Sequence, residues 1–306
     1  MPALTLAQSA ALTQDMLLAG VIETLVTTDQ FFSIMPFMEI EGNSLAYNRE
    51  LAMGDSQFAT VGTTITAKAA ATFTPATSAL TKIIGDAEVD EFIQSTRSNY
   101  SDQKATQIAS KAKSVARTYA NTLINGDGTS NSFAGLLSLA AAGQTLNVGD
   151  NGAALSFDIL DELIDTVKDK DGVVDYMLMN SRTLRSYNAL LRALGGASIS
   201  DVVTLPSGVQ VPAYRGVPIL KNDWIPINQT KGTTVGTTTT IMAGTFDDGS
   251  GKIGISGLTA MGSAGIRVQD VGISETKDES ITRVKWYTGL ANFSQLGLAI
   301  APGITN

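Results

Sequence analysis

The chain has 306 residues, of which 43% are hydrophobic and only 16% are charged, so it can bury a sizeable core and is not a disordered protein. Its net charge of −8 argues against a protein that wraps nucleic acid, because such proteins need clustered Lys and Arg. The sequence contains no Cys and no His, which excludes thiol nucleophiles, disulfides, Ser-His catalysis and most zinc sites.

Residues 4–30 are helix-prone and lack the basic start of a secretory signal. The next segment, "FFSIMPFMEI", is predicted to be extended because Pro36 opposes a helix. From residue 42 onward, small or apolar residues alternate with polar ones in two arms, separated by a stretch of Gly, Ser and Thr (Gly54 to Gly62). This pattern predicts a long β-hairpin. Because a two-stranded ribbon is only marginally stable in water, we expect it to rest on another surface.

The region from Asp86 to Ile124 has neither Pro nor Gly, and its apolar residues recur near helical spacing. It is predicted to form one helix, roughly 55–60 Å long. The next stretch, "LINGDGTSNSFAGLL" (Leu123 to Leu137), follows a helix C-terminus, so it presents carbonyls rather than the N–H groups of a phosphate loop. It also lacks the closing Glu of a calcium loop. We expect Gly126 and Gly128 to end the helix in left-handed conformations.

The second half of the chain alternates helices and strands, which favours a mixed α+β fold. "SFDILDELIDTVKDK" is predicted to be an amphipathic helix with Ser156 as its N-cap, "VDYMLMN" a buried strand and "NSRTLRSYNALLRALGG" a second helix. "NQTKGTTVGTTTT" is predicted to be a flexible, low-complexity loop. Four further strands are predicted at "TIMAGTF", "KIGIS", "IRVQDVG" and "ITRVKWYTGLANFS".

No motif supports catalysis. Asp161, Glu162 and Asp165 lie on one predicted helix and are interpreted as its solvated face rather than as an acid/base pair. The Ser-x-x-Lys spacings at 101–104 and 110–113 lack the partner motifs of the enzymes that use them, and "DKDG" and "DDGSGK" are interpreted as turns. We therefore expect no enzyme, and no catalytic, metal-binding or cofactor-binding residue.

Six segments follow one another along the chain: "FMEIEGNSLAYNRE", "TFTPATSALTKIIGDAEVDEF", "LINGDGTSNSFAGLL", "YMLMNSRTLRSYNALLRALGG", "YRGVPILKNDWIP" and "IMAGTFDDGSGKIGISG". Their order and spacing resemble the major capsid proteins of tailed double-stranded DNA bacteriophages, which have the Hong Kong 97-type fold. In that family, similar segments enter an extended loop, leave a long spine helix and build an axial domain. Each motif alone is weak, and Thr245 stands here where the family often has Asp.

The resemblance implies an N-terminal arm (1–41), an extended loop hairpin (42–76), a peripheral domain with the spine helix (77–132 and 262–306) and an axial α/β domain (133–261). The family's extended loop lies on the neighbouring subunit, which implies inter-subunit contacts for Arg49, Phe58, Ile65, Lys68 and Phe73. Some members crosslink a loop Lys to an Asn of an adjacent subunit. Lys68 is the candidate donor here, and the sequence does not locate its acceptor.

The implied function is a shell subunit that assembles with itself, through pentamers and hexamers, into an icosahedral capsid around double-stranded DNA that it binds without sequence specificity. The implied partners are a portal protein, in some members a decoration protein, and a separate scaffolding protein, because no long charged helical region precedes the loop. The implied location is the virion, after assembly in the host bacterial cytoplasm, with no cofactor and no membrane contact.

Three alternatives remain open. An encapsulin, a bacterial compartment shell of the same fold that encloses cargo enzymes, would use an N-terminal helix such as residues 4–30 predict. A hydrolase that uses Asp and Glu, and a tail or adhesion protein, belong to other functional classes.

Overall fold

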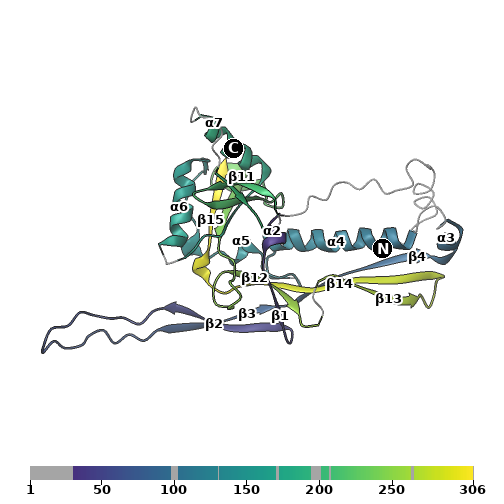
Figure 1. Cartoon of the computed structure of the whole chain (residues 1–306), viewed down its shortest axis with the longest axis horizontal. Coiled ribbons are helices and arrows are strands. Elements are labelled where there is room, and N and C mark those ends of the chain that lie inside the picture. The colour runs from purple at the N-terminus through teal and green to yellow at the C-terminus, as the bar shows by residue number, and fades with distance from the viewer. Residues whose placement is uncertain are drawn as a thin grey trace.

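The computed structural model describes residues 30–97, 103–129, 131–169, 172–193, 201–206, 208–262 and 265–305. Most of the expected N-terminal arm therefore lies outside the described residues. The described chain forms two sheets and a projecting two-stranded ribbon (Figure 1). The ribbon and the first sheet, with the long helix that covers it, extend in opposite directions from the centre. The second sheet with its helices stands to one side.

The first sheet is organised around β14 (Glu279–Asn292), the longest strand. One edge of β14 pairs with β4 (Thr81–Asp90) through ten residues. The other edge pairs first with β13 (Arg267–Ile273) and then with β12 (Ile255–Ala260), which β1 (Phe37–Ile40) joins in parallel. Alternate residues of β14 are buried under helix α4 (Gln103–Asn125), as the period of two in a strand requires.

The prediction of one helix from Asp86 to Ile124 is wrong in its first part. Residues up to Asp90 belong to β4, and the short helix α3 (Glu91–Arg97) follows, capped by the Asp90 carboxylate, which accepts from the N–H of Phe92 at 2.8 Å. Helix α4 begins only at Gln103. The segment has no helix breaker, but pairing along β14 satisfies its backbone and buries Ala87 and Val89, so tertiary contacts override local propensity.

The central strands of the second sheet are buried on both faces. Its strand order is β5 (Ala153–Ala154), β15 (Leu298–Thr305), β11 (Thr234–Gly244), β6 (Tyr176–Met179), β9 (Val217–Lys221), β8 (Gln210–Tyr214) and β7 (Asp201–Thr204), with β10 (Gln229–Lys231) beside β11. Helix α6 (Phe157–Lys168) packs against β15 and β11, and the core of that face also includes Tyr187 of α7 (Ser181–Ala193). The predicted N-cap is confirmed, since the Ser156 hydroxyl accepts from the N–H of Ile159.

Two sequence predictions for this sheet are wrong. The Thr-rich stretch expected to be a flexible loop forms β10 and most of β11, because β-branched Thr suits a strand that has neighbours on both sides. The last residues, expected in the peripheral domain with β14, instead form β15 of the second sheet, between the short edge strand β5 and β11. A short 3-10 helix (Gln295–Gly297) carries the chain from one sheet to the other.

The other expected domain limits also differ from the sheets. β12 lies in the first sheet although residues 133–261 were expected to form a separate axial unit, and β1 joins that sheet although it was expected in the arm. A long-range parallel pair such as β1 and β12 leaves no mark on local sequence, so spacing along the chain could not place either strand.

Aromatic rings hold the two sheets together at helix α2 (Gln30–Ile34). Phe31 is fully buried and meets Tyr176 of the second sheet at a centroid distance of 4.9 Å. Its neighbour Phe32 lies 5.6 Å from Tyr119 of α4 and 6.0 Å from Trp286 of β14. Adjacent side chains of one short helix therefore contact different sheets, and edge-to-face ring pairs of this kind fix orientation as well as burying area.

The helix-exit corner begins where α4 ends. Gly128 has φ of +72°, as expected, but Gly126 does not adopt a left-handed conformation. Gly126 is required for space instead: a Cβ there would lie 2.2 Å from the Phe133 carbonyl oxygen and 2.6 Å from that of Thr122. The Gly126 carbonyl accepts from the N–H of Gly135 at 2.8 Å, so two glycines allow the returning chain to touch the end of the helix.

Asp127 closes the same corner with its side chain. Its carboxylate accepts from the Thr129 hydroxyl and N–H and from the Ser132 hydroxyl. These bonds, led by the Thr129 hydroxyl, lower the pKa of Asp127 to about 2. The folded carboxylate therefore favours the corner above the ordinary pKa of 3.8, and this contribution is lost as the pH falls toward 2. The stretch is a structural turn, and its described residues do not have the geometry of a phosphate-binding loop.

Truncation of the ring at the sheet junction should destabilise the fold. Phe31→Ala removes a fully buried ring that touches both Tyr176 and Phe246, so we expect a loss of about 3–5 kcal/mol in the free energy of unfolding. The matched control, Phe73→Ala, removes a ring that is 63% exposed and should change that free energy by less than about 0.5 kcal/mol. Denaturant unfolding measures both, and equal effects would contradict the role of the junction.

A methyl group at Gly126 should disrupt the helix exit. Gly126→Ala places a Cβ against two backbone carbonyls, neither of which can rotate away, so we expect a loss of about 1–3 kcal/mol or a failure to fold. Gly143→Ala is the control, because nothing lies within 4 Å of its Cβ position. Thermal unfolding compares the two variants. A Gly126→Ala protein as stable as the control would show that the corner has room for a methyl group at this position.

Candidate assembly surface

The projecting ribbon consists of β2 (Ser44–Ala52) and β3 (Thr72–Ala79), paired antiparallel, with residues 53–71 forming its distal part (Figure 1). Its base is attached to its own chain. The Tyr47 hydroxyl and the Arg49 guanidinium both donate to the Asn292 carbonyl at the end of β14, and the Tyr47 ring packs on Phe293 at 5.2 Å. The body of the subunit therefore sets the direction in which the ribbon leaves.

The distal part has no such support. The hydrogen bonds of residues 53–71 stay within the ribbon. Large apolar side chains nevertheless stand in solvent along this part and at the start of β3, with Phe58 and Val61 fully exposed: Met53, Phe58, Val61, Ile65 and Phe73. Burial of a side chain of this size stabilises a complex by about 1.5–3 kcal/mol, so these exposed side chains form a candidate interaction surface.

Four of the five predicted contact residues are exposed on the ribbon, and three of them are members of this surface. Phe58, Ile65, Lys68 and Phe73 are exposed along the ribbon. Arg49 is half-buried, and its guanidinium bonds the carbonyls of Asn292 and Phe293 of its own chain. It anchors the base of the ribbon, and its contact with a neighbouring subunit stays a prediction.

Sequence analysis missed Met53 and Val61 as members of the surface. Val61 occupies the tip, where the N–H of Thr63 bonds the Thr60 carbonyl and Gly62 has φ of +87°. A β-branched apolar residue immediately before a turn glycine is unusual, because turn positions favour Asn, Asp, Ser and Pro. That departure from turn chemistry could have marked Val61 as a contact residue.

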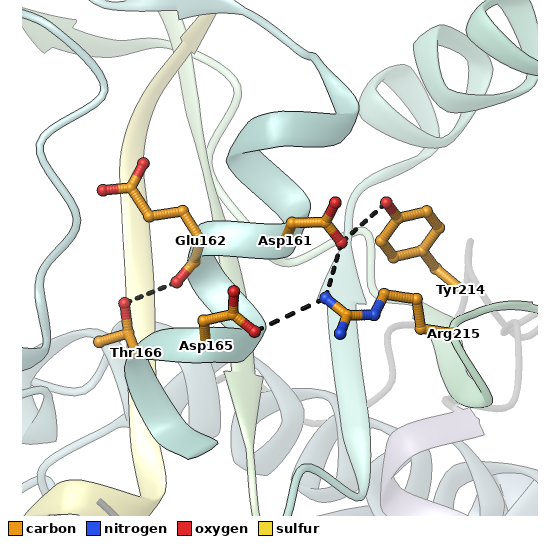
Figure 2. Close-up of polar contacts among 6 residues, drawn as sticks. All are labelled: Asp161, Glu162, Asp165, Thr166, Tyr214 and Arg215. Carbon is orange, nitrogen blue, oxygen red and sulfur yellow. Dashed lines mark hydrogen bonds and ion pairs between the residues drawn. The ribbon is translucent and has the colours of Figure 1, made fainter. Parts of the chain in front are cut away.

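The carboxylates of α6 form an ion-pair network on the surface of the second sheet (Figure 2). Asp161 accepts from the Tyr214 hydroxyl and from Arg215, each at 2.9 Å, and Arg215 lies 3.6 Å from Asp165. Glu162 takes no part in this network in the view of Figure 2. The network ties α6 to the β8–β9 turn, where Arg215 has φ of +52°.

This network has no feature of an acid/base site. About half of the Asp161 and Asp165 side-chain surface remains exposed. Burial, followed by the bond to Asp161, raises the pKa of Tyr214 to about 12, and burial raises the pKa of Tyr119 and Tyr176. None of these phenols ionises near neutral pH, so none can serve as a general base there. The interpretation of Asp161, Glu162 and Asp165 as a polar helix surface agrees with this geometry.

Within the ranges described above, no group of three or more acidic side chains is placed to hold a metal ion. No helix among those residues is long and apolar enough to cross a bilayer. Ser110 and Lys113 lie on α4, whereas Ser101 of the other Ser-x-x-Lys spacing lies outside the described residues.

Known structures share this fold at low sequence identity. The encapsulin of the holo-SrpI complex from Synechococcus elongatus PCC 7942 superposes with a TM-score of 0.73 and 19% identity, over 99% of this chain and 97% of that one. The capsid of a native GTA particle gives a TM-score of 0.68 and 17% identity, over 92% of each chain. The protein of Microbacterium phage Oxtober96 gives 0.63 and 16%, over 99% of each.

The sequence itself matches one protein family. No curated protein matches the chain in sequence. Residues 56–214, which run from the distal ribbon through α4 and α6 to β8, match the SU10 major capsid protein family. Because that match spans just over half of the residues, the chain belongs to the SU10 major capsid protein family.

Proposed function

We propose that this capsid protein assembles with itself, through pentamers and hexamers, into a closed icosahedral shell that encloses a double-stranded DNA genome. The observation that carries the proposal is the ribbon, whose distal apolar side chains have no partner within the described part of their own chain. A second copy that covers this surface accounts for its exposure. Each subunit then gives its ribbon to one neighbour and receives one from another, a head-to-tail contact that closes into rings.

The two sheets take different places in this proposal. The layer of α4 and the first sheet forms the peripheral part of a capsomer, and the second sheet with α6 and α7 forms the part around the capsomer axis. Within the described residues, the strand assignments support a peripheral part made of 37–97, 103–125, 255–262 and 265–292. They support an axial part made of 153–244 with 298–305. The proposed partners are scaffolding, portal and decoration proteins, with assembly in the host bacterial cytoplasm.

An encapsulin-type compartment is the second candidate function. The superposition on the encapsulin over nearly the full length of both chains favours it, whereas the sequence match to a phage capsid family favours a genome container. The fold is common to both, so the contents of the shell decide between them.

Electron microscopy of the purified protein tests the proposal. We expect closed shells that carry nuclease-protected DNA when they are isolated from infected cells, whereas a protein cargo without DNA would establish the compartment function. A variant with residues 54–70 replaced by Asn-Gly should keep its thermal unfolding temperature, because Tyr47 and Arg49 still anchor the base, and should form no shells. Shells of normal size from this variant would contradict the proposed role of the ribbon.

Lys68 is proposed as the donor of an inter-subunit isopeptide crosslink, since its side chain is exposed on the ribbon. Mature shells boiled in SDS should then give a ladder of covalent multimers, and Lys68→Arg shells should give monomers. A single monomer band from unmodified mature shells would rule the crosslink out.

A further inference from the structure

The distal ribbon keeps the register of its base, with one backbone rung from the Asp55 N–H to the Ala69 carbonyl at 3.2 Å, but most of its cross-arm hydrogen bonds come from side chains. In the last pair of the ladder, Ala52 faces Thr72. The same register places Asp55 opposite Ala69 and Gln57 opposite Ala67. At both positions the N–H of the alanine bonds a side-chain oxygen: Asp55 Oδ1 at 2.6 Å and Gln57 Oε1 at 2.7 Å.

Gln57 holds the facing arm at three residues, Thr64, Thr66 and Ala67. Its Oε1 also accepts from the N–H of Thr66 at 2.8 Å and from the Thr66 hydroxyl at 2.6 Å, while its Nε2 donates to the Thr64 carbonyl at 3.2 Å. The donors and the acceptor on the facing arm fix the orientation of the amide, because reversing it would set Nε2 against three donors. Gln57 and Ala67 are half-buried, whereas the residues on either side of each are exposed.

We propose that Asp55 and Gln57 form a side-chain clamp that pre-organises the distal ribbon in the free subunit, and that this clamp sets the concentration at which shells assemble. The inference rests on the proposed function and adds two positioning residues to it. Residues 53–71 contain no strand within them, so without the clamp each arm would sample many conformations. Only the fraction of subunits with a formed ribbon can dock, and the apparent affinity falls by that fraction.

The clamp also fixes the relative positions of exposed apolar side chains on the two arms of the ribbon. Phe58 and Ile65 follow and precede the bonded residues Gln57 and Thr66. Holding those neighbours fixes the spacing between the two apolar side chains before a second copy arrives. A docking surface that is formed in advance avoids the ordering cost at the moment of contact.

The test compares Gln57→Ala with two controls. Asp55→Asn keeps an oxygen acceptor for Ala69, and Ser56→Ala alters an exposed residue that lies between the clamp residues and makes no side-chain hydrogen bond within the described chain. Amide hydrogen exchange is measured on the chain below its assembly concentration. In Gln57→Ala, the N–H groups of Thr66 and Ala67 each lose their hydrogen bond to Oε1, so exchange at these two amides should become roughly fivefold faster. Exchange in both controls should stay near that of the unmodified protein.

The assembly concentration, measured by light scattering, should rise by a similar factor in Gln57→Ala, while its unfolding temperature stays unchanged because the distal ribbon does not touch the core. Unchanged exchange would overturn the clamp, and faster exchange with unchanged assembly would overturn its role in assembly. If the unmodified protein forms no shells, the proposed function fails and the assembly role with it, but the exchange rates still decide whether the clamp exists.

Discussion

The ring contacts around α2 are the interaction on which the rest of the structure depends. Phe31 packs on Tyr176 and Phe246, and Phe32 packs on Tyr119 and Trp286. Helix α2 therefore joins the second sheet to the layer formed by α4 and the first sheet. The passage of the chain from β14 into β15 joins the same two sheets covalently. Two sheets that are close-packed through one cluster move as one body, and a rigid body can hold a ribbon in a defined direction.

Different parts of the subunit serve its stability and its assembly. Its two cores bury the apolar faces of both sheets. Among the described residues, the three most exposed large apolar side chains, Met53, Phe58 and Val61, lie on the ribbon, and others, such as Ile273 of β13, lie elsewhere on the surface. The Asp161–Arg215–Tyr214 network serves the first task by tying α6 to a strained turn. The ribbon serves the second, because hydrogen bonds give it shape but give its side chains no cover.

Structures with 16–19% sequence identity share this arrangement over most of their length. Such sequences keep the layers and their order while nearly every side chain changes, because many apolar sets of similar volume fill the same core. The family match identifies a capsid protein, whereas the shared fold does not identify the contents of a shell. The contents depend on surfaces and partners rather than on the cores.

The sequence by itself determined the hairpin, α6 with its Ser156 cap, and the strand–helix order of the second half, because each depends on residues close together in the chain. It also predicted that the hairpin rests on another surface, since a two-stranded ribbon is only marginally stable in water. Only the tertiary structure decided that Thr81–Asp90 is a strand, that β15 crosses into the second sheet, and that Arg49 anchors its own ribbon. Each of these depends on a partner far away in the chain, and local propensity carries no information about that partner.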